Sequence, residues 1–120
     1  MTNFDAIIKL HNMLESSGIE HGFRSMNGGY QVVYPTFDAW DAVLRAYHQC
    51  PRSLYCRVQG NAISVVLTPY SWGRDEGKLE IMGMLTDDEL VLEDVAAVTV
   101  EEAFRRIAEA EENKREVMGV

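Results

Sequence analysis

The sequence predicts a single α+β domain spanning residues 1–120. Its antiparallel sheet of about five to six strands would carry an N-terminal helix, a C-terminal helix and one inserted helix. Three observations lead to this fold class. The chain has 120 residues, which is the length of one domain. Residues 4–17 and 100–114 have apolar side chains at helical spacing, and short apolar runs separated by turn residues lie between them.

The first predicted helix covers residues 4–17. Thr2 and Asp5 are spaced so that their side chains can satisfy backbone N–H groups at its start. Gly18 followed by Ile19 is typical of a left-handed helix stop, in which the residue after the glycine packs against the last turn. The sequence therefore marks both ends of this helix.

Two hairpins are predicted after it. Residues 21–26 and 30–34 flank an Asn-Gly-Gly turn, where a positive φ costs little. Residues 53–58 and 62–67 flank a Gln-Gly-Asn turn in the same way. The apolar run of the last of these strands is nearly continuous, which indicates burial on both of its faces.

The inserted helix is expected between the two hairpins. Pro35 ends the preceding strand, and Thr36 can cap a helix over 37–48, where aromatic and aliphatic residues recur every three or four positions. We expect this stripe to lie in the core. Residues 68–77 are rich in turn formers and predict a loop, after which 78–82 returns to the sheet.

Two capping boxes of the form Thr-x-x-Glu mark helix starts in the last third of the chain. In such a box each side chain bonds the backbone N–H group of the other residue. Thr86 and Glu89 form the first box, which opens at most one helical turn. Thr99 and Glu102 form the second, which opens the C-terminal helix directly after a predicted strand at 95–98.

Negative charge is concentrated in the last 46 residues. The net charge is −8, from 11 basic and 19 acidic residues. Residues 1–74 have six basic and five acidic residues, whereas 75–120 have five basic and fourteen acidic residues, a net charge of −9. The acids form three groups: Asp75, Glu76 and Glu80; Asp87, Asp88, Glu89, Glu93 and Asp94; and Glu101, Glu102, Glu109, Glu111, Glu112 and Glu116. Together they would attract a basic partner, or simply form a solvated face.

The same charge balance disfavours phosphate backbones and anionic lipids as direct ligands. No apolar run approaches the ~18 residues that span a membrane, and the N-terminus lacks the basic and then apolar pattern of a signal peptide. We therefore expect a cytoplasmic protein that binds neither membranes nor nucleic acid.

No arrangement of residues predicts catalysis, so we expect a protein without enzymatic activity and without a cofactor. His48, Cys50 and Cys56 offer three potential zinc ligands, but a structural zinc site takes four, and cytosolic thiols stay reduced. The acids at 87–94 lack the spacing of a calcium loop. His11 lies at the edge of the first helix's apolar stripe, where we expect it to flank the core.

The 68–77 loop is the strongest candidate for a binding site, because it combines Tyr, Trp and Arg, the residue types enriched at interface hot spots. If Trp72 is exposed, the loop and the acidic stretch after it would form one docking surface. If Trp72 folds back, it covers the sheet instead. The predicted partner-binding residues are Tyr70, Trp72, Arg74, Asp75, Glu76, Asp87, Asp88, Glu89, Glu93 and Asp94.

Three segments, roughly a third of the chain, resemble a group of small uncharacterised proteins encoded by phages and prophages of Gram-positive bacteria. They are GYQVVYP at 29–35, YSWG leading to LEIMGMLT within 70–86, and VTVEEAFRRI at 98–107. Trp72 stands where Tyr is usual in the group, and 36–61 looks like an insertion. The resemblance implies the cytoplasm of a bacterial host cell as the location, and it supplies no chemistry.

Together these patterns predict a non-catalytic, phage-encoded interaction protein that binds a basic host or phage protein through its acidic surface. One specific form is an inhibitor of a bacterial defence nuclease, as anti-CRISPR proteins are. Two alternatives stay open. One is a small-molecule or minor enzymatic domain, with an aromatic pocket lined by Trp40, Tyr47, Tyr30 and Tyr34. The other is a homo-oligomer that buries either 62–67 or the aromatic loop.

Overall fold

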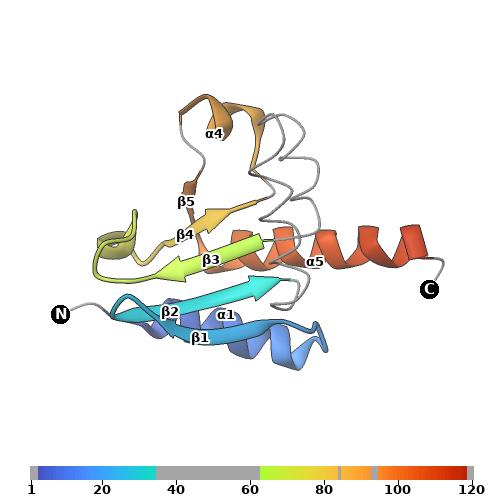
Figure 1. The fold of residues 1–120 in the computed structure, drawn as a ribbon, viewed down its shortest axis with the longest axis horizontal. Coiled ribbons are helices and arrows are strands. Elements are labelled where there is room, and N and C mark those ends of the chain that lie inside the picture. The colour runs from blue at the N-terminus through green and yellow to red at the C-terminus, as the bar shows by residue number, and fades with distance from the viewer. Residues whose placement is uncertain (1–2, 35–62, 84, 93–94, 119–120) are drawn as a thin grey trace.

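The computed structural model describes residues 3–34, 63–83, 85–92 and 95–118. Its elements are α1 (Asp5–Ser16), β1 (Gly22–Met26), β2 (Gly29–Tyr34), β3 (Ile63–Leu67), the 3₁₀ turn η2 (Arg74–Glu76), β4 (Leu79–Met82), α4 (Asp87–Leu92), β5 (Ala96–Val98) and α5 (Val100–Met118). The five strands form one antiparallel sheet in the order β1-β2-β3-β4-β5 (Figure 1). The predicted α+β class is confirmed, with a helix at each end of the chain. The predicted helix at 37–48 lies outside the described residues.

Both long helices cover the same face of the sheet, behind it in Figure 1. α1 packs on β2 and β3, α5 packs on β4, and the two helices contact each other. The core between these layers includes Leu10 and Leu14 of α1, Val65 of β3 and Ile107 of α5, all fully buried. None of the described helices combines the length and the apolar character that crossing a lipid bilayer requires.

The first hairpin has the predicted turn. Asn27 and Gly28 adopt positive φ angles of 48° and 82°, and Met26 pairs with Gly29 across this two-residue connection. Strand alternation then turns Val32 and Tyr34 toward the helices. The Tyr34 hydroxyl donates a hydrogen bond to Glu111 Oε2 of α5 at 2.7 Å.

β3 is the central strand, with β2 on one edge and β4 on the other. As predicted, the strand is largely buried: Ile63 and Val65 are completely buried, and only Val66 is half-buried. The predicted hairpin pairing of this strand with 53–58 is wrong, because both edges of Ser64–Val66 are already paired. Residues 53–58 themselves lie outside the described part. The alternative that buries 62–67 in a symmetric interface stays a prediction.

The structure tests the predicted end of α1 fully and its predicted start only in part. At its start the Asn3 Oδ1 atom accepts the N–H of Asp5 at 2.8 Å, while the predicted cap Thr2 lies outside the described residues. At its end Gly18 adopts φ 68°, and the N–H of Ile19 donates to the Leu14 carbonyl at 3.0 Å. The predicted glycine stop is therefore confirmed.

The two capping boxes differ in completeness. In the first, the Thr86 N–H donates to Glu89 Oε1 at 2.8 Å and the Glu89 N–H donates to Thr86 Oγ1 at 3.2 Å. In the second, the Glu102 N–H donates to Thr99 Oγ1 at 3.1 Å, but the Glu102 carboxylate turns to two arginines of α5 instead. The second box is thus formed on one side only.

Arg106 joins α4 to α5. Its Nη1 and Nη2 atoms donate to the two carboxylate oxygens of Glu89 at 2.9 and 3.1 Å, and its Nε donates to Glu102 Oε1 at 2.9 Å. The arginine is buried. Hydrogen bonds from Arg105 and then from Arg106 lower the pKa of Glu102 to about 2. The short helix α4, which has little stability of its own, is therefore held by a paired guanidinium.

Candidate protein-binding site

The first half of the 68–77 loop is ordered by hydrogen bonds between Thr68 and Ser71. The Thr68 N–H donates to Ser71 Oγ at 3.1 Å, and the Ser71 hydroxyl donates to the Thr68 carbonyl at 3.0 Å. Both residues are buried. The Tyr70 N–H donates to Thr68 Oγ1 at 3.1 Å, so the backbone that carries Tyr70 is also fixed.

The second half of the loop is anchored to the sheet. The backbone N–H of Trp72 donates to Glu80 Oε2 of β4 at 2.8 Å, and Arg74 Nη1 donates to the Ser71 carbonyl at 2.9 Å. Gly73 adopts φ 79°, and a Cβ atom at this position would lie 2.9 Å from the Cβ of Ala97 in β5. Only glycine permits this close approach of the loop to the edge strand.

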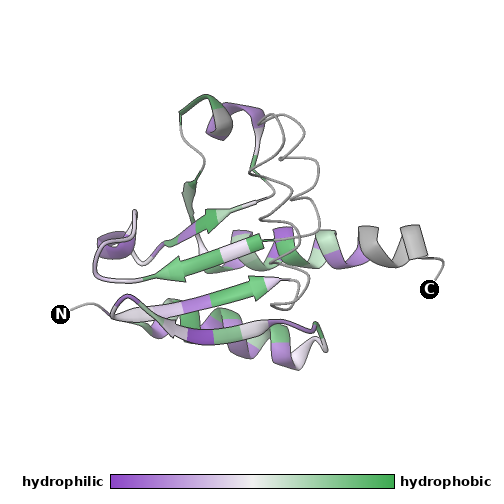
Figure 2. Cartoon of the chain, in the orientation of Figure 1, coloured by the Kyte–Doolittle hydropathy of each residue, from purple (hydrophilic) through white to green (hydrophobic). Residues whose placement is uncertain are grey.

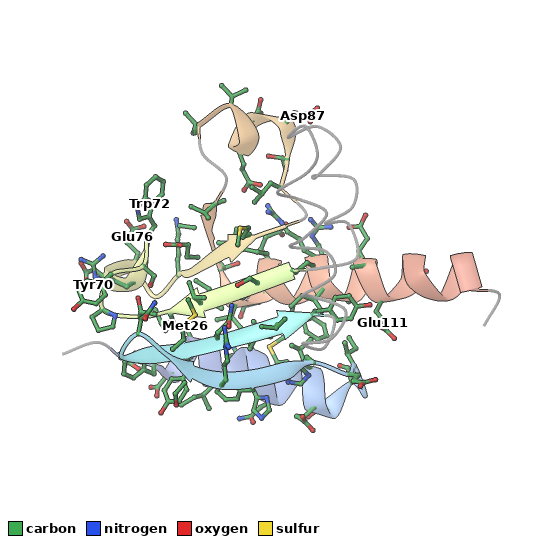
Figure 3. All side chains as sticks on the ribbon, viewed as in Figure 1. Met26, Tyr70, Trp72, Glu76, Asp87 and Glu111 are labelled. Carbon is green, nitrogen blue, oxygen red and sulfur yellow. The ribbon has the colours of Figure 1, made fainter. Side chains whose placement is uncertain are left out.

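This ordered loop leaves two aromatic residues in solvent. Tyr70 is 79% exposed and Trp72 is 51% exposed. Of the two predicted positions for Trp72, the structure shows the exposed one. Figure 3 shows both side chains at one end of the sheet, on the connection between β3 and β4. Exposed aromatic side chains on a fixed backbone are typical of preorganised binding surfaces, because little conformational entropy is lost on contact.

An open hollow of about 550 Å³ lies beside Tyr70. It is lined by Met26, Asn27, Gly28, Val66, Thr68, Tyr70, Ser71 and Glu80. One Glu80 oxygen accepts the Trp72 N–H, and its other oxygen has no hydrogen-bond partner among the described residues. The hollow therefore offers a carboxylate, an aromatic ring and apolar walls, a combination that suits the alkyl stem and the cationic head of Arg or Lys.

The acids of η2 lie further along the same loop, where Asp75 lines a separate hollow beside Asp5 and Lys9 of α1. Asp75 and Glu76 are exposed. Glu76 forms an ion pair with Lys78 at 3.4 Å, whereas Asp75 has no ion-pair partner within the described ranges. Figure 2 shows that η2 is hydrophilic, in contrast to the hydrophobic strand β3 that leads into the loop.

The remaining predicted binding residues lie elsewhere. The loop precedes β4 and α4 follows it, so the two groups occupy opposite ends of that strand, and Figure 3 shows Asp87 away from Trp72. Asp87 and Asp88 are exposed on α4. Glu93 and Asp94 lie outside the described residues. The predicted set is thus divided between two places on the molecule.

Glu89 differs from its acidic neighbours because its carboxylate is engaged within the chain. Partial burial alone would raise its pKa, but hydrogen bonds from Arg106 and Thr86 outweigh that effect and lower the pKa. The side chain holds α4 in position. We therefore assign Glu89 a positioning role, and its contact with a partner stays a prediction.

Two of the four residues of the alternative aromatic pocket lie in the described part of the chain. Tyr34 is buried in the core against α5, and Tyr30 packs against Phe4 and Phe23 at ring-centre distances of 5.4 Å. Tyr34 thus belongs to the packed core, whereas Tyr30, besides its ring contacts, lines an open hollow together with Phe4 and the β1–β2 turn. Trp40 and Tyr47 of the predicted pocket lie outside the described residues. The potential zinc ligands His48, Cys50 and Cys56 also lie outside them.

Of the residues that line the hollow, the sequence patterns single out Tyr70 as a binding residue but not Glu80 or Met26. Glu80 belongs to the first acidic group, and its alternation with buried Leu79 and Ile81 places it on the opposite face of β4. That alternation is a usable signal. Met26 has no such signal, because only the sheet register brings the β1–β2 turn beside the β3–β4 loop.

No protein-family model, no curated protein and no solved structure matches this chain. The resemblance to phage-encoded proteins therefore stays a prediction.

Proposed function

We propose that this protein is a non-catalytic binding protein that recognises a basic segment of a partner protein at the 68–77 loop. The observation that carries the proposal is the ordered loop, which holds Tyr70 and Trp72 exposed beside the hollow that contains Glu80. A basic side chain of the partner enters this hollow, where it pairs with the free Glu80 oxygen and lies against the Tyr70 ring.

Charge supports the choice of a basic partner. The net charge of −9 over 75–120 attracts cations at long range, and Asp75 and Glu76 add local negative charge within the loop itself. Backbone hydrogen bonds already fix the loop, so binding orders few additional groups.

The test uses a peptide of alternating arginine and leucine as the probe, with the citrulline peptide as its uncharged match. Trp72 fluorescence reports binding once Trp40, the other tryptophan, is replaced by Phe. We expect the arginine peptide to bind and the citrulline peptide to bind much more weakly. Tyr70→Ala and Glu80→Gln should each weaken binding about tenfold, the loss typical of a hot-spot residue.

The matched control is Glu20→Gln, which removes an exposed carboxylate away from the loop. It should leave the affinity unchanged. Equal binding of the arginine and citrulline peptides, or equal affinity of the Glu80→Gln variant and the parent, would contradict the proposal.

The narrower form of the proposal makes the partner a bacterial defence nuclease, in line with the phage resemblance. Such enzymes present basic surfaces to nucleic acid, which an acidic protein with an aromatic anchor can cover. The assay is target-DNA cleavage by a purified CRISPR nuclease with and without this protein. We expect inhibition by the parent and none by the Tyr70→Ala/Trp72→Ala variant. Equal inhibition by both would exclude the loop as the inhibitory surface.

A further inference from the structure

A second cluster of polar side chains lies away from the loop, at the C-terminal end of α1. His11 and Glu15 are one helical turn apart on α1, so they share a face of the helix. The glycine stop at Gly18 then reverses the chain, and His21 returns beside them just before β1. Three side chains of metal-binding type therefore converge from two parts of the chain.

Their donor atoms are close together. His11 Nδ1 lies 2.8 Å from His21 Nε2, and His21 Nε2 lies 3.8 Å from Glu15 Oε1. All three donor atoms lie within 4.8 Å of one another. Tetrahedral zinc with bonds of about 2.0–2.1 Å separates its ligand atoms by about 3.3 Å. The observed separations bracket that value, so small side-chain shifts would complete the geometry.

The His21 ring is already oriented for coordination. Its Nδ1 atom lies 2.8 Å from the carbonyl oxygen of Ile19, which can only accept, so Nδ1 carries the proton. In the neutral ring Nε2 then accepts a hydrogen bond from His11 Nδ1, and a metal ion bound here would replace that hydrogen bond, with the His11 proton held on Nε2 instead. A backbone carbonyl that fixes the tautomer of a ligating histidine is a regular feature of metal sites. The side chain of His21 is also 1% exposed, which leaves it few other rotamers.

His11 is held by packing. Its ring lies 4.3 Å from the ring of Phe23 and 5.0 Å from that of His21, measured between centres. Glu15 is exposed and is free to move toward the two imidazoles. The cluster thus combines two positioned nitrogen ligands with one mobile oxygen ligand.

We propose that His11, Glu15 and His21 bind a divalent transition-metal ion of the zinc class, with solvent in the fourth position. Imidazole and carboxylate ligands suit zinc, copper and nickel, whereas calcium and magnesium prefer ligand sets made only of oxygen. The bound ion ties the end of α1 to the start of β1, and it stabilises the folded chain by mass action. This inference is independent of the proposed binding function.

The experiment titrates the full-length protein with Zn²⁺ by calorimetry and with Co²⁺ by visible absorption. The protein should carry His48→Gln, Cys50→Ser and Cys56→Ser, because those residues can also bind zinc. We expect one equivalent of metal to bind, a d–d spectrum without a thiolate charge-transfer band, and a higher Tm in the presence of Zn²⁺.

Glu15→Gln is the decisive variant, because the side chain is exposed and its loss leaves the fold intact. We expect its Zn²⁺ affinity to fall at least about tenfold, since even outer-shell partners of metal ligands contribute that much. His11→Gln should give a similar loss, with circular dichroism as the check on folding. Glu20→Gln is the matched control and should bind like the parent.

Two results would overturn the proposal. One is the absence of saturable binding in the variant that lacks His48, Cys50 and Cys56. The other is equal affinity of Glu15→Gln and Glu20→Gln, which would show that the metal does not contact Glu15.

Discussion

Gly29 shows how a single residue without a side chain sets the spacing of two strands. A Cβ atom at this position would lie 2.0 Å from the carbonyl oxygen of Leu67 and 2.7 Å from the Cα of Thr68. Both neighbours are backbone atoms at the end of β3, which cannot move without opening the pairing of Tyr30 with Leu67. We expect Gly29→Ala to lower the free energy of unfolding by about 3 kcal/mol or more.

Gly18→Ala is the matched control for this prediction. Gly18 has φ 68° and no atom within 4 Å of a built Cβ, so alanine there meets only the left-handed backbone cost of roughly 1–2 kcal/mol. Urea denaturation of both variants gives the comparison. An equal loss of stability in the two would show that strand spacing at Gly29 is not the cause.

The lowered pKa of Glu102 makes the stability of the folded protein depend on pH in the acid range. Hydrogen bonds from Arg105 and Arg106 lower its pKa from 4.5 to about 2, so the folded state keeps the carboxylate charged at pH values where the unfolded chain is protonated. Its contribution to stability is therefore complete above pH 4.5 and is lost as the pH falls toward 2.

We expect Glu102→Gln to be less stable than the parent at neutral pH and to lose less stability between pH 4.5 and 2. Urea denaturation over a pH series measures both effects. Glu112→Gln changes an exposed glutamate of the same helix and is the control. Parallel pH curves for Glu102→Gln and the parent would exclude this residue as a source of the acid sensitivity.

At the level of whole elements, α4 depends on Arg106. Removing this guanidinium leaves Glu89 and Glu102 without their shared partner, and the six-residue helix has no comparable tie within the described residues. We expect Arg106→Ala to lower the free energy of unfolding by roughly 2–3 kcal/mol. Amide hydrogen exchange in α4 should accelerate more than in β3, because local opening comes before global unfolding.

Arg105→Ala is the natural control, since it removes a neighbouring guanidinium whose ion pairs are exposed and lie within one helix. Such pairs contribute little, and α4 does not contact Arg105 through any described ion pair. If Arg105→Ala accelerates exchange in α4 as much as Arg106→Ala does, the bridge between the helices is not what holds α4.

The ends of helices could be predicted from the sequence where the capping residues lie close together in the chain. The glycine stop of α1 and the box of Thr86 with Glu89 depend on residues within five positions of one another, and both formed as predicted. The box at Thr99 formed on one side only, because Arg105 and Arg106 compete for the Glu102 carboxylate. The Thr-x-x-Glu pattern alone does not show that two arginines compete for the glutamate.

For the whole molecule, periodicity was enough to predict the α+β class and both long helices. It was not enough to predict the neighbours of β3, since strand pairing depends on contacts distant in sequence. The same limit applies to the candidate sites. Tyr70 and Trp72 could be predicted from residue type, whereas the hollow between Met26 and Glu80 exists only once the sheet is assembled.

The negative charge of the whole molecule should set the rate at which a basic peptide associates, whereas the aromatic contact should set the rate at which it dissociates. Asp75, Asp87 and Asp88 are exposed and lie at both ends of β4, so their negative charge acts on an approaching cation before any contact forms. Replacing all three by Asn should slow association of the arginine peptide at low salt and leave its dissociation rate nearly unchanged. Tyr70→Ala should do the reverse, because an aromatic contact is made only in the complex.

Salt concentration distinguishes the two effects in stopped-flow measurements. At 1 M NaCl the Debye length is about 3 Å, so the triple Asn variant and the parent should associate at the same rate. The faster dissociation of Tyr70→Ala should persist at that concentration, because ring contact is not screened. If the triple variant instead changes the dissociation rate at both salt concentrations, these acids touch the peptide, and α4 belongs to the binding surface together with the loop.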